Sequence, residues 1–232
     1  MIKVGYCQYM MNSISNKSLR REGLKMKGLF LAMVLAVGLC CNGMASAMVQ
    51  RGHLEGANFT MDYPLVYAQN AAAQKAINGD IYTYIARVQG NAAAFEKSSL
   101  NYSVKYEDAR LISLVFVQQE YRARAAHGSY HYYGVVYDKN TGARIPLSNY
   151  LRVTPEQVMQ EAENSLYTLT GKKIPYRWQN FSLKSVPDRY FLLGNGEIAV
   201  LFEPYDMDCF AMGATYVRFS REKLAYYNSR NS

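Results

Sequence analysis

The sequence lacks the short motifs that mark several large enzyme classes. Its 232 residues contain no Walker-type phosphate-binding loop, no G-x-G-x-x-G dinucleotide fingerprint, no G-x-S-x-G nucleophile elbow and no H-E-x-x-H zinc motif. Internal repeats and low-complexity tracts are also absent. These absences argue against nucleotide-dependent enzymes, α/β-type serine hydrolases, zinc proteases of that motif and repeat architectures.

The apolar run at Leu29–Leu39 is too short to cross a membrane, because a spanning helix needs about 20 residues. It follows a short positive start at Met26–Gly28 and precedes the small residues Ala45–Ala47. A positive, an apolar and a small-residue region in this order are typical of a secretory signal peptide. We therefore expect residues 26–47 to be cleaved after Ala47, which leaves a secreted or periplasmic protein without a transmembrane anchor.

The residues ahead of Met26 do not resemble a targeting segment, because they are polar, mixed and without periodicity. We expect translation to start at Met26 and residues 1–25 to reflect a gene-start error. Cys40 and Cys41 leave lipidation open as an alternative, although neither follows the small residue that a lipoprotein signal requires.

Cleavage would change the charge and the cysteine count. Residues 1–47 carry a net charge of +5, so their loss lowers the formal net charge from +8 to +3. A mildly basic chain gives little reason to expect a nucleic-acid partner. Of the four cysteines only Cys209 would remain, which excludes an intrachain disulfide. Because Cys209 lies in an apolar stretch, we expect it to be buried.

The mature part has the pattern of an α+β protein. A capping box at Thr154 with Gln157, and Pro155 at the first helical position, mark the start of one helix, which we expect to stop at Gly171. Successive strand-like segments, separated by two main helical segments, favour antiparallel β-sheets with two main helices packed on them. Strands are expected at 54–63, 102–107, 111–124, 130–137, 144–147, 190–193, 198–202 and 215–219, and helices at 65–97, 154–171 and 222–227.

Histidines and carboxylates offer only weak candidate sites. His127 and His131 could share one face of a strand and hold a metal with Glu120 or Asp138, but two histidines without a fixed third ligand are a weak signal. We expect no metal and no cofactor, and we assign no catalytic residue. The acidic stretch 203–208 follows a strand and reads most simply as a polar turn.

Tyrosine is abundant, with 21 residues, and three of them cluster at Tyr130, Tyr132 and Tyr133. Alternation along a strand puts Tyr132 and Tyr133 on opposite faces, so at least one of them should enter the core. An exposed tyrosine suits sugar stacking or protein contacts, because it combines a flat apolar ring with a hydroxyl.

Two pairs of segments resemble a known family. Arg124–Gly128 and Tyr137–Leu147 resemble the alanine-histidine-glycine strand and the threonine-glycine hairpin of the DUF3298 domain. Phe202–Met207 and Ala211–Gly213 resemble its proline-tyrosine-glutamate and alanine-x-glycine segment, although an aspartate stands in place of the glutamate. Residues 54–125 resemble the DUF4163 domain that usually precedes it.

The resemblance implies a fold like the C-terminal domain of the anti-sigma factor RsiV. It implies a DUF4163-like subdomain at 48–125 and a DUF3298-like subdomain at 126–232. In RsiV this extracytoplasmic domain binds lysozyme, and in deacetylases that carry it the catalysis belongs to a separate domain. This chain shows neither the sigma-binding part nor the deacetylase domain, so the resemblance argues for a stand-alone envelope module.

Two functional hypotheses follow. The first is an exported binding module whose partner is a lysozyme-like protein or peptidoglycan. The second is an envelope hydrolase that uses His127 with Glu203 or Asp208, which requires these side chains to approach within about 3 Å, directly or through one water.

Oligomeric state is not indicated. The candidate ligand-binding surface consists of His127, His131, Tyr132, Tyr205 and Asp206.

Overall fold

Strands dominate the part of the chain that the computed structural model describes, which comprises residues 49–175, 183–207 and 210–231. The expected signal peptide, residues 1–25, Asp208 and Cys209 lie outside it. No helix of these residues is both long and apolar enough to span a membrane. The elements are β1 (Val49–Gly56), β2 (Phe59–Val66), α2 (Ala71–Asn91), β3 (Lys97–Glu107), β4 (Leu111–Tyr121), β5 (Ser129–Asp138), α3 (Pro155–Ser165), β6 (Leu166–Thr168), β7 (Tyr190–Gly194), β8 (Glu197–Phe202), β9 (Thr215–Phe219) and α4 (Arg221–Arg230).

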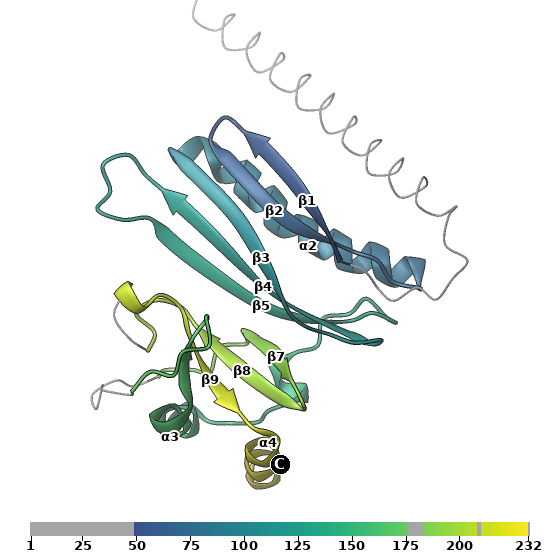
Figure 1. Cartoon of the computed structure of the whole chain (residues 1–232), viewed down its shortest axis with the longest axis vertical. Helices are drawn as coiled ribbons and strands as arrows, with labels where there is room; N and C mark the ends of the chain where they lie inside the picture. Colours follow the sequence, from purple (N-terminus) through teal and green to yellow (C-terminus); the bar gives the residue numbers. More distant parts are fainter. Residues whose placement is uncertain (1–48, 176–182, 208–209, 232) are drawn as a thin grey trace, which may run out of the picture. The chain divides into compact units, whose positions relative to one another are not determined.

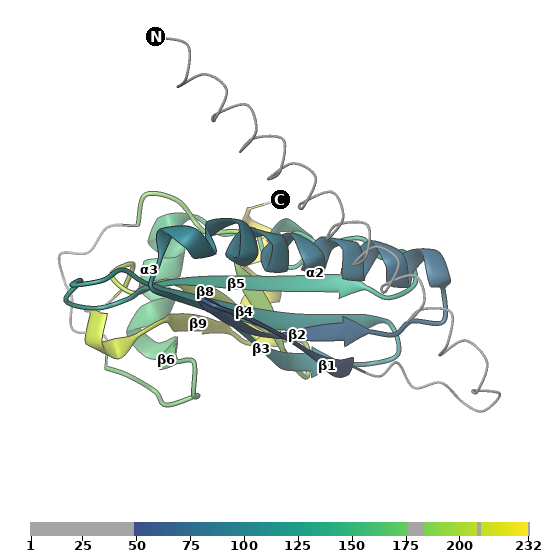
Figure 2. The same ribbon diagram turned by 90° about the horizontal axis from the view of Figure 1, so that it is seen from above.

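The first sheet contains five strands in the order β1-β2-β3-β4-β5 (Figure 1). All neighbours are antiparallel except β2 and β3, which are parallel over Phe59–Met61. Parallel neighbours need a crossover connection, and α2 provides it. Figure 2 shows α2 lying along one face of this sheet.

A polar cap and an apolar stripe define α2. The Asn70 side chain accepts hydrogen bonds from the backbone N–H groups of Ala72 and Ala73, which satisfies donors that the first helical turn leaves open. The buried stripe of the helix packs on alternate residues of β2 to β5, and together they form the first core. Its members include Ile77, Ile81, Ile85, Val88, Met61, Leu100, Ile112, Leu114 and Phe116.

The second sheet has the order β6-β9-β8-β7 and is antiparallel throughout. The β7–β8 hairpin at one edge of this sheet turns at Gly194, Asn195 and Gly196, all with positive φ, as the Gly-Asn-Gly sequence predicts. One face of this sheet packs against side chains of α3 and α4, including Val158, Ala162 and Tyr227. The other face packs against Val115 and Tyr132 of the first sheet.

The two sheets approach most closely where β7 crosses β5. Gly134 lies so near the backbone of Tyr190 that a Cβ atom at this position would come within 2.5 Å of the Tyr190 carbonyl oxygen. Nearby, the backbone N–H of Leu192 donates to the buried hydroxyl of Ser113 at 2.9 Å. Glycine is therefore required at position 134 by space, and the buried polar groups of β7 are satisfied by β4.

The predicted α+β class is confirmed, with helices packed on mostly antiparallel sheets. The first sheet runs across the expected subdomain boundary near residue 125, because β4 and β5 pair with one another. Residues Ser46–Ser232 form one compact unit. The division into a DUF4163-like and a DUF3298-like subdomain stays a prediction.

The expected single strand at 54–63 is wrong, because the segment forms the β1–β2 hairpin that turns at Ala57 and Asn58. Pro64 lies inside β2 rather than ending it. Beyond Met61, β2 no longer pairs with β3. Pro64 is therefore tolerated in the strand although proline has no backbone N–H to donate. The helix expected at 65–97 consequently begins only at Ala71, after its Asn70 cap.

The helix that starts at Thr154 has the predicted capping box, with both reciprocal hydrogen bonds to Gln157. It ends at Ser165 and not at Gly171. Leu166 is buried, but it belongs to β6, which pairs with β9. Tertiary pairing here overrides the helical periodicity, and Gly171 with a φ of 84° serves the following turn.

The turn after β5 predicts a specific acid sensitivity. Asp138 accepts hydrogen bonds from the backbone N–H groups of Asn140 and Thr141 and from Arg110 Nε at 2.8 Å. The Arg110 hydrogen bond is the main cause that holds the pKa of Asp138 below its ordinary value. A lowered folded-state pKa gives stability that is present above pH about 4 and lost as the pH falls through the folded-state pKa.

In Asp138→Asn the amide oxygen can still accept from the turn, but the ion pair with Arg110 is gone. We expect the stability difference between wild type and this variant to shrink as the pH is lowered from 6 to 3, measured by urea unfolding at each pH. A difference that stays constant or grows in acid would contradict this assignment.

Candidate functional site

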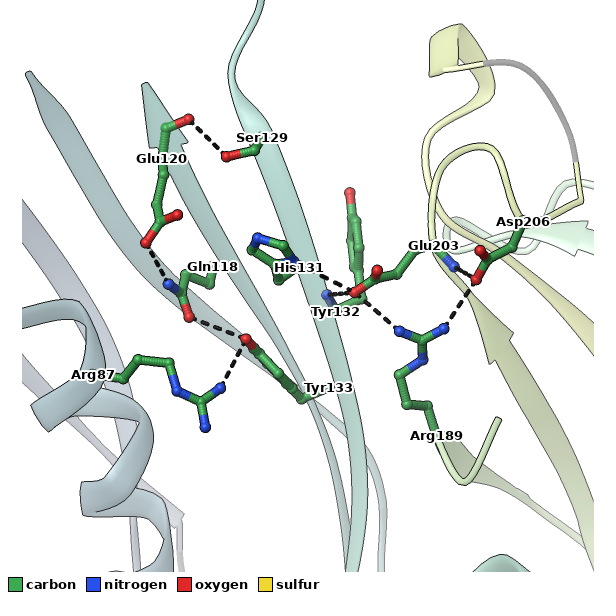
Figure 3. A network of polar contacts seen from close by, with 10 residues as sticks. All are labelled: Arg87, Gln118, Glu120, Ser129, His131, Tyr132, Tyr133, Arg189, Glu203 and Asp206. Carbon is green, nitrogen blue, oxygen red and sulfur yellow. Dashed lines mark hydrogen bonds and ion pairs between the residues drawn. The ribbon is translucent and has the colours of Figure 1, made fainter. Parts of the chain in front are cut away.

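The segment after β8 folds back onto the exposed edge of β5 (Figure 3). The Glu203 side chain reaches the edge strand, and its Oε1 accepts the backbone N–H of Tyr132 at 3.1 Å. An unpaired donor on an edge strand attracts foreign strands, so this carboxylate also blocks unwanted pairing. The contact brings two segments together that lie 71 residues apart in the sequence.

Arg189 fixes two carboxylates of this segment at once. Its Nη1 lies 3.1 Å from Glu203 Oε1, and its Nη2 donates to Asp206 Oδ2 at 2.9 Å. The same Asp206 oxygen accepts the backbone N–H of Glu203 at 2.9 Å. His131 lies alongside, with Nδ1 3.9 Å from Glu203 Oε1. Arg189, which precedes β7, therefore holds both carboxylates of the turn after β8 in one geometry.

Beside this polar cluster lies a group of rings that we call the aromatic surface. It consists of His127, Tyr130, Tyr205 and Phe210. The Phe210 ring is central, with its centroid 4.1 Å from that of His127, 5.9 Å from that of Tyr130 and 5.6 Å from that of Tyr205. None of the four side chains is fully buried. Aromatic faces gathered at the surface offer a platform on which another flat apolar face can stack.

Tyr205 is the most unusual member of the aromatic surface. Its backbone has a φ of 75°, in the left-handed region, which is a genuine outlier for a bulky side chain. The side chain is also the most exposed large hydrophobic group of the described residues, at 59%. The strained backbone and the exposed apolar ring each disfavour the folded state. Such strain is typical of functional sites.

The structure brings all five sequence-predicted residues to one region. His127 and Tyr205 belong to the aromatic surface, and His131 and Asp206 belong to the polar cluster. Tyr132 contributes its backbone N–H, whereas its ring is 9% exposed and packs in the core between the sheets. Burial raises the pKa of the Tyr132 phenol, which therefore stays neutral.

Sequence reasoning missed Arg189 and Phe210. Arg189 comes just before β7 and shares no motif with the carboxylates that it binds. Phe210 follows the acidic stretch at a short distance, and only its proximity to Tyr205 in the sequence could have drawn attention to it. Both roles depend on contacts between segments that no local pattern encodes.

The geometry offers little to acid–base catalysis or metal binding. His127 Nδ1 is 2.9 Å from the carbonyl oxygen of Gly128, and its ring stacks on Phe210, so among the described residues no carboxylate contacts it. Glu203 already accepts from Arg189 and from Tyr132. Glu120, one expected metal ligand, is buried and accepts from Gln118 instead. Across residues 49–175, 183–207 and 210–231, no three metal-binding side chains gather.

Comparisons with known proteins place the fold. No family model matches the sequence, and no curated protein matches it. A crystal structure of a DUF3298 family member from Bacteroides fragilis matches with a TM-score of 0.54 and 12% identity, covering 78% of this chain and 93% of that one. A DUF3298 family protein from Pseudomonas aeruginosa matches with a TM-score of 0.52 and 11% identity, covering 78% and 91%.

At these identities the similarity concerns the fold, and it covers most of the length of both known structures. It agrees with the DUF3298 resemblance of the motifs around His127, Thr141 and Tyr205. The described part of this chain therefore has the α+β fold seen in DUF3298 family proteins.

Proposed function

We propose that the protein is an extracytoplasmic binding module of the DUF3298 type, and that the aromatic surface binds a cell-wall glycan. The observation that carries the proposal is the strained, solvent-exposed Tyr205 beside Phe210. Its ring is exposed in a backbone conformation that favours glycine, although glycine would fill the turn at lower cost. A binding role accounts for a tyrosine at this position.

The chemistry of the region suits a sugar. Pyranose rings present apolar C–H faces that stack on aromatic side chains, and hydroxyl groups that need hydrogen-bond acceptors. Asp206 and Glu203 lie next to the rings, and Arg189 holds both carboxylates in place. A site of fixed carboxylates beside a ring platform loses little conformational entropy on binding.

The export pattern at residues 26–47 supports an extracytoplasmic location, where such a glycan is available. The DUF4163-like half and the likeness to RsiV are part of the same proposal, with a lysozyme-like protein as the competing partner. The hydrolase alternative gains no support, because within the described residues His127 contacts Gly128 and Phe210 rather than a carboxylate.

The decisive variant is Tyr205→Gly. Glycine accepts a φ of 75° without strain, so we expect the free energy of unfolding to stay the same or to rise by up to about 1 kcal/mol. Binding should weaken about five- to tenfold, because loss of one stacked ring costs about 1 to 1.4 kcal/mol. The measurements are urea unfolding and co-sedimentation with insoluble peptidoglycan.

Tyr226→Ala is the matched control, since Tyr226 is an exposed tyrosine on α4 and outside the aromatic surface. It should sediment like wild type. A parallel pull-down with immobilised lysozyme separates the two partners. Retention by lysozyme alone would replace the glycan with a protein ligand, and retention of Tyr205→Gly equal to wild type would remove the aromatic surface from the account.

A further inference from the structure

An exposed arginine near the end of α2 is held in one orientation by aromatic side chains. Arg87 Nη1 donates to the Tyr133 hydroxyl at 3.0 Å. Its guanidinium carbon lies 5.3 Å from the centroid of the Tyr133 ring and 5.8 Å from that of Tyr84. A free arginine side chain gives up about 2 kcal/mol of rotamer entropy when it is fixed, so this order needs a cause.

A directional chain of hydrogen bonds supports Arg87 from inside the protein (Figure 3). The Glu120 carboxylate can only accept, so the Gln118 amide turns its Nε2 toward it, at 2.7 Å. Gln118 Oε1 then accepts the Tyr133 hydroxyl proton at 3.2 Å, which leaves the phenol oxygen free to accept from Arg87. Gln118 is 2% and Glu120 7% exposed, so two polar side chains are buried to orient one surface cation.

Within residues 49–175, 183–207 and 210–231, no carboxylate forms an ion pair with the Arg87 guanidinium. Other arginines do pair with carboxylates, namely Arg51, Arg110, Arg144, Arg189 and Arg218. Arg87 uses one N–H for Tyr133, and an arginine carries five donors in a planar fork. The remaining donors are oriented but not neutralised.

We infer that Arg87 is the centre of a binding site for an oxyanion, a carboxylate or a phosphate group. Such groups match the guanidinium fork with two parallel hydrogen bonds. His131 adds to the site, because it pairs with Gln118 across the strands and so shares this face of the sheet. Tyr133 is a positioning residue that acts through Arg87. The site shares no residue with the aromatic surface, although His131 also lies 3.9 Å from Glu203 of the polar cluster.

The test is a titration of the protein with inorganic phosphate, and separately with acetate, followed by the NMR signals of the arginine Nε–H groups. Wild type should show saturable shifts of the Arg87 signal in at least one series, and the tighter ligand identifies the oxyanion. Arg87→Gln should weaken binding at least tenfold. Arg87→Lys keeps the charge but not the fork, so it should recover only part of the affinity.

Arg51→Gln is the control, because Arg51 is exposed like Arg87 but is already paired with Asp62. It should bind the anion like wild type. Tyr133→Phe keeps the ring and removes the orienting hydroxyl, so it should weaken anion binding several-fold. No saturable shift in wild type, or equal affinity in Arg87→Gln, would overturn the site. Arg87→Gln should still bind peptidoglycan like wild type, so a failure of the anion site can be distinguished from a failure of the proposed function.

Discussion

Replacing Gly134 with alanine is expected to lower the free energy of unfolding by about 3 kcal/mol, the upper range for overpacking a rigid site. The added Cβ would lie 2.5 Å from the Tyr190 carbonyl oxygen and 2.8 Å from its nitrogen. These are backbone atoms, which cannot turn aside as a side chain can. β7 would have to move away from β5, and the core between the sheets would open.

Such a loss should lower the melting temperature by about 10 °C for a domain of this size. Gly79→Ala is the matched control, because a Cβ at this helical position of α2 would meet nothing within 4 Å beyond the neighbouring backbone of its own helix. It should stabilise the protein by about 0.5 to 1 kcal/mol. If both variants changed stability equally, the close packing of β7 on β5 would be wrong.

The second large effect is expected for Asp80→Ala, at about 3 kcal/mol. Asp80 Oδ2 accepts the Tyr137 hydroxyl at 2.6 Å, and Oδ1 accepts Arg144 Nη2 at 3.0 Å. Arg144 also donates to the Tyr84 hydroxyl at 2.8 Å. One carboxylate on α2 thus ties the helix to β5 and to the chain that follows it.

Removal of Asp80 leaves the Tyr137 hydroxyl without its acceptor in a fully buried position. An unsatisfied buried donor costs about 1 to 3 kcal/mol, and the lost charged hydrogen bond adds to this, although solvent weakens it because Arg144 is half exposed. Burial, together with the Asp80 hydrogen bond, raises the pKa of Tyr137, so the hydroxyl keeps its proton throughout the neutral range.

The double variant Asp80→Ala with Tyr137→Phe tests this cause. Because it removes the stranded donor as well, it should be more stable than Asp80→Ala alone. Asp62→Ala breaks an exposed pair with Arg51 and should change the melting temperature little. A double variant less stable than the single one would show that the hydroxyl is not the origin of the loss.

Local signals in the sequence located most of the elements but not all of their ends. The turn at Gly194–Gly196 and the Thr154 cap depend on neighbouring residues, so both could be predicted. The end of α3 could not be predicted, because Leu166 lies in a strand and not in the helix. This strand pairs with β9, about 50 residues away. Pairing partners decide such boundaries.

The candidate site was predictable in its members and not in its geometry. Family-like motifs indicated His127 and Tyr205, but their meeting through Phe210 requires β5 and the segment after β8 to pack side by side. The role of Arg189 is likewise invisible in the sequence. Long-range contacts of this kind follow from the way the two sheets pack.

Titrating soluble peptidoglycan fragments into isotope-labelled protein and recording amide and aromatic chemical shifts tests most directly whether the aromatic surface binds a cell-wall glycan. Binding there should give saturable shifts concentrated at residues 127–132 and 203–207 and at Phe210, and these shifts should be lost in Tyr205→Gly. Shifts at another face of the molecule, or none in wild type, would contradict binding at the aromatic surface.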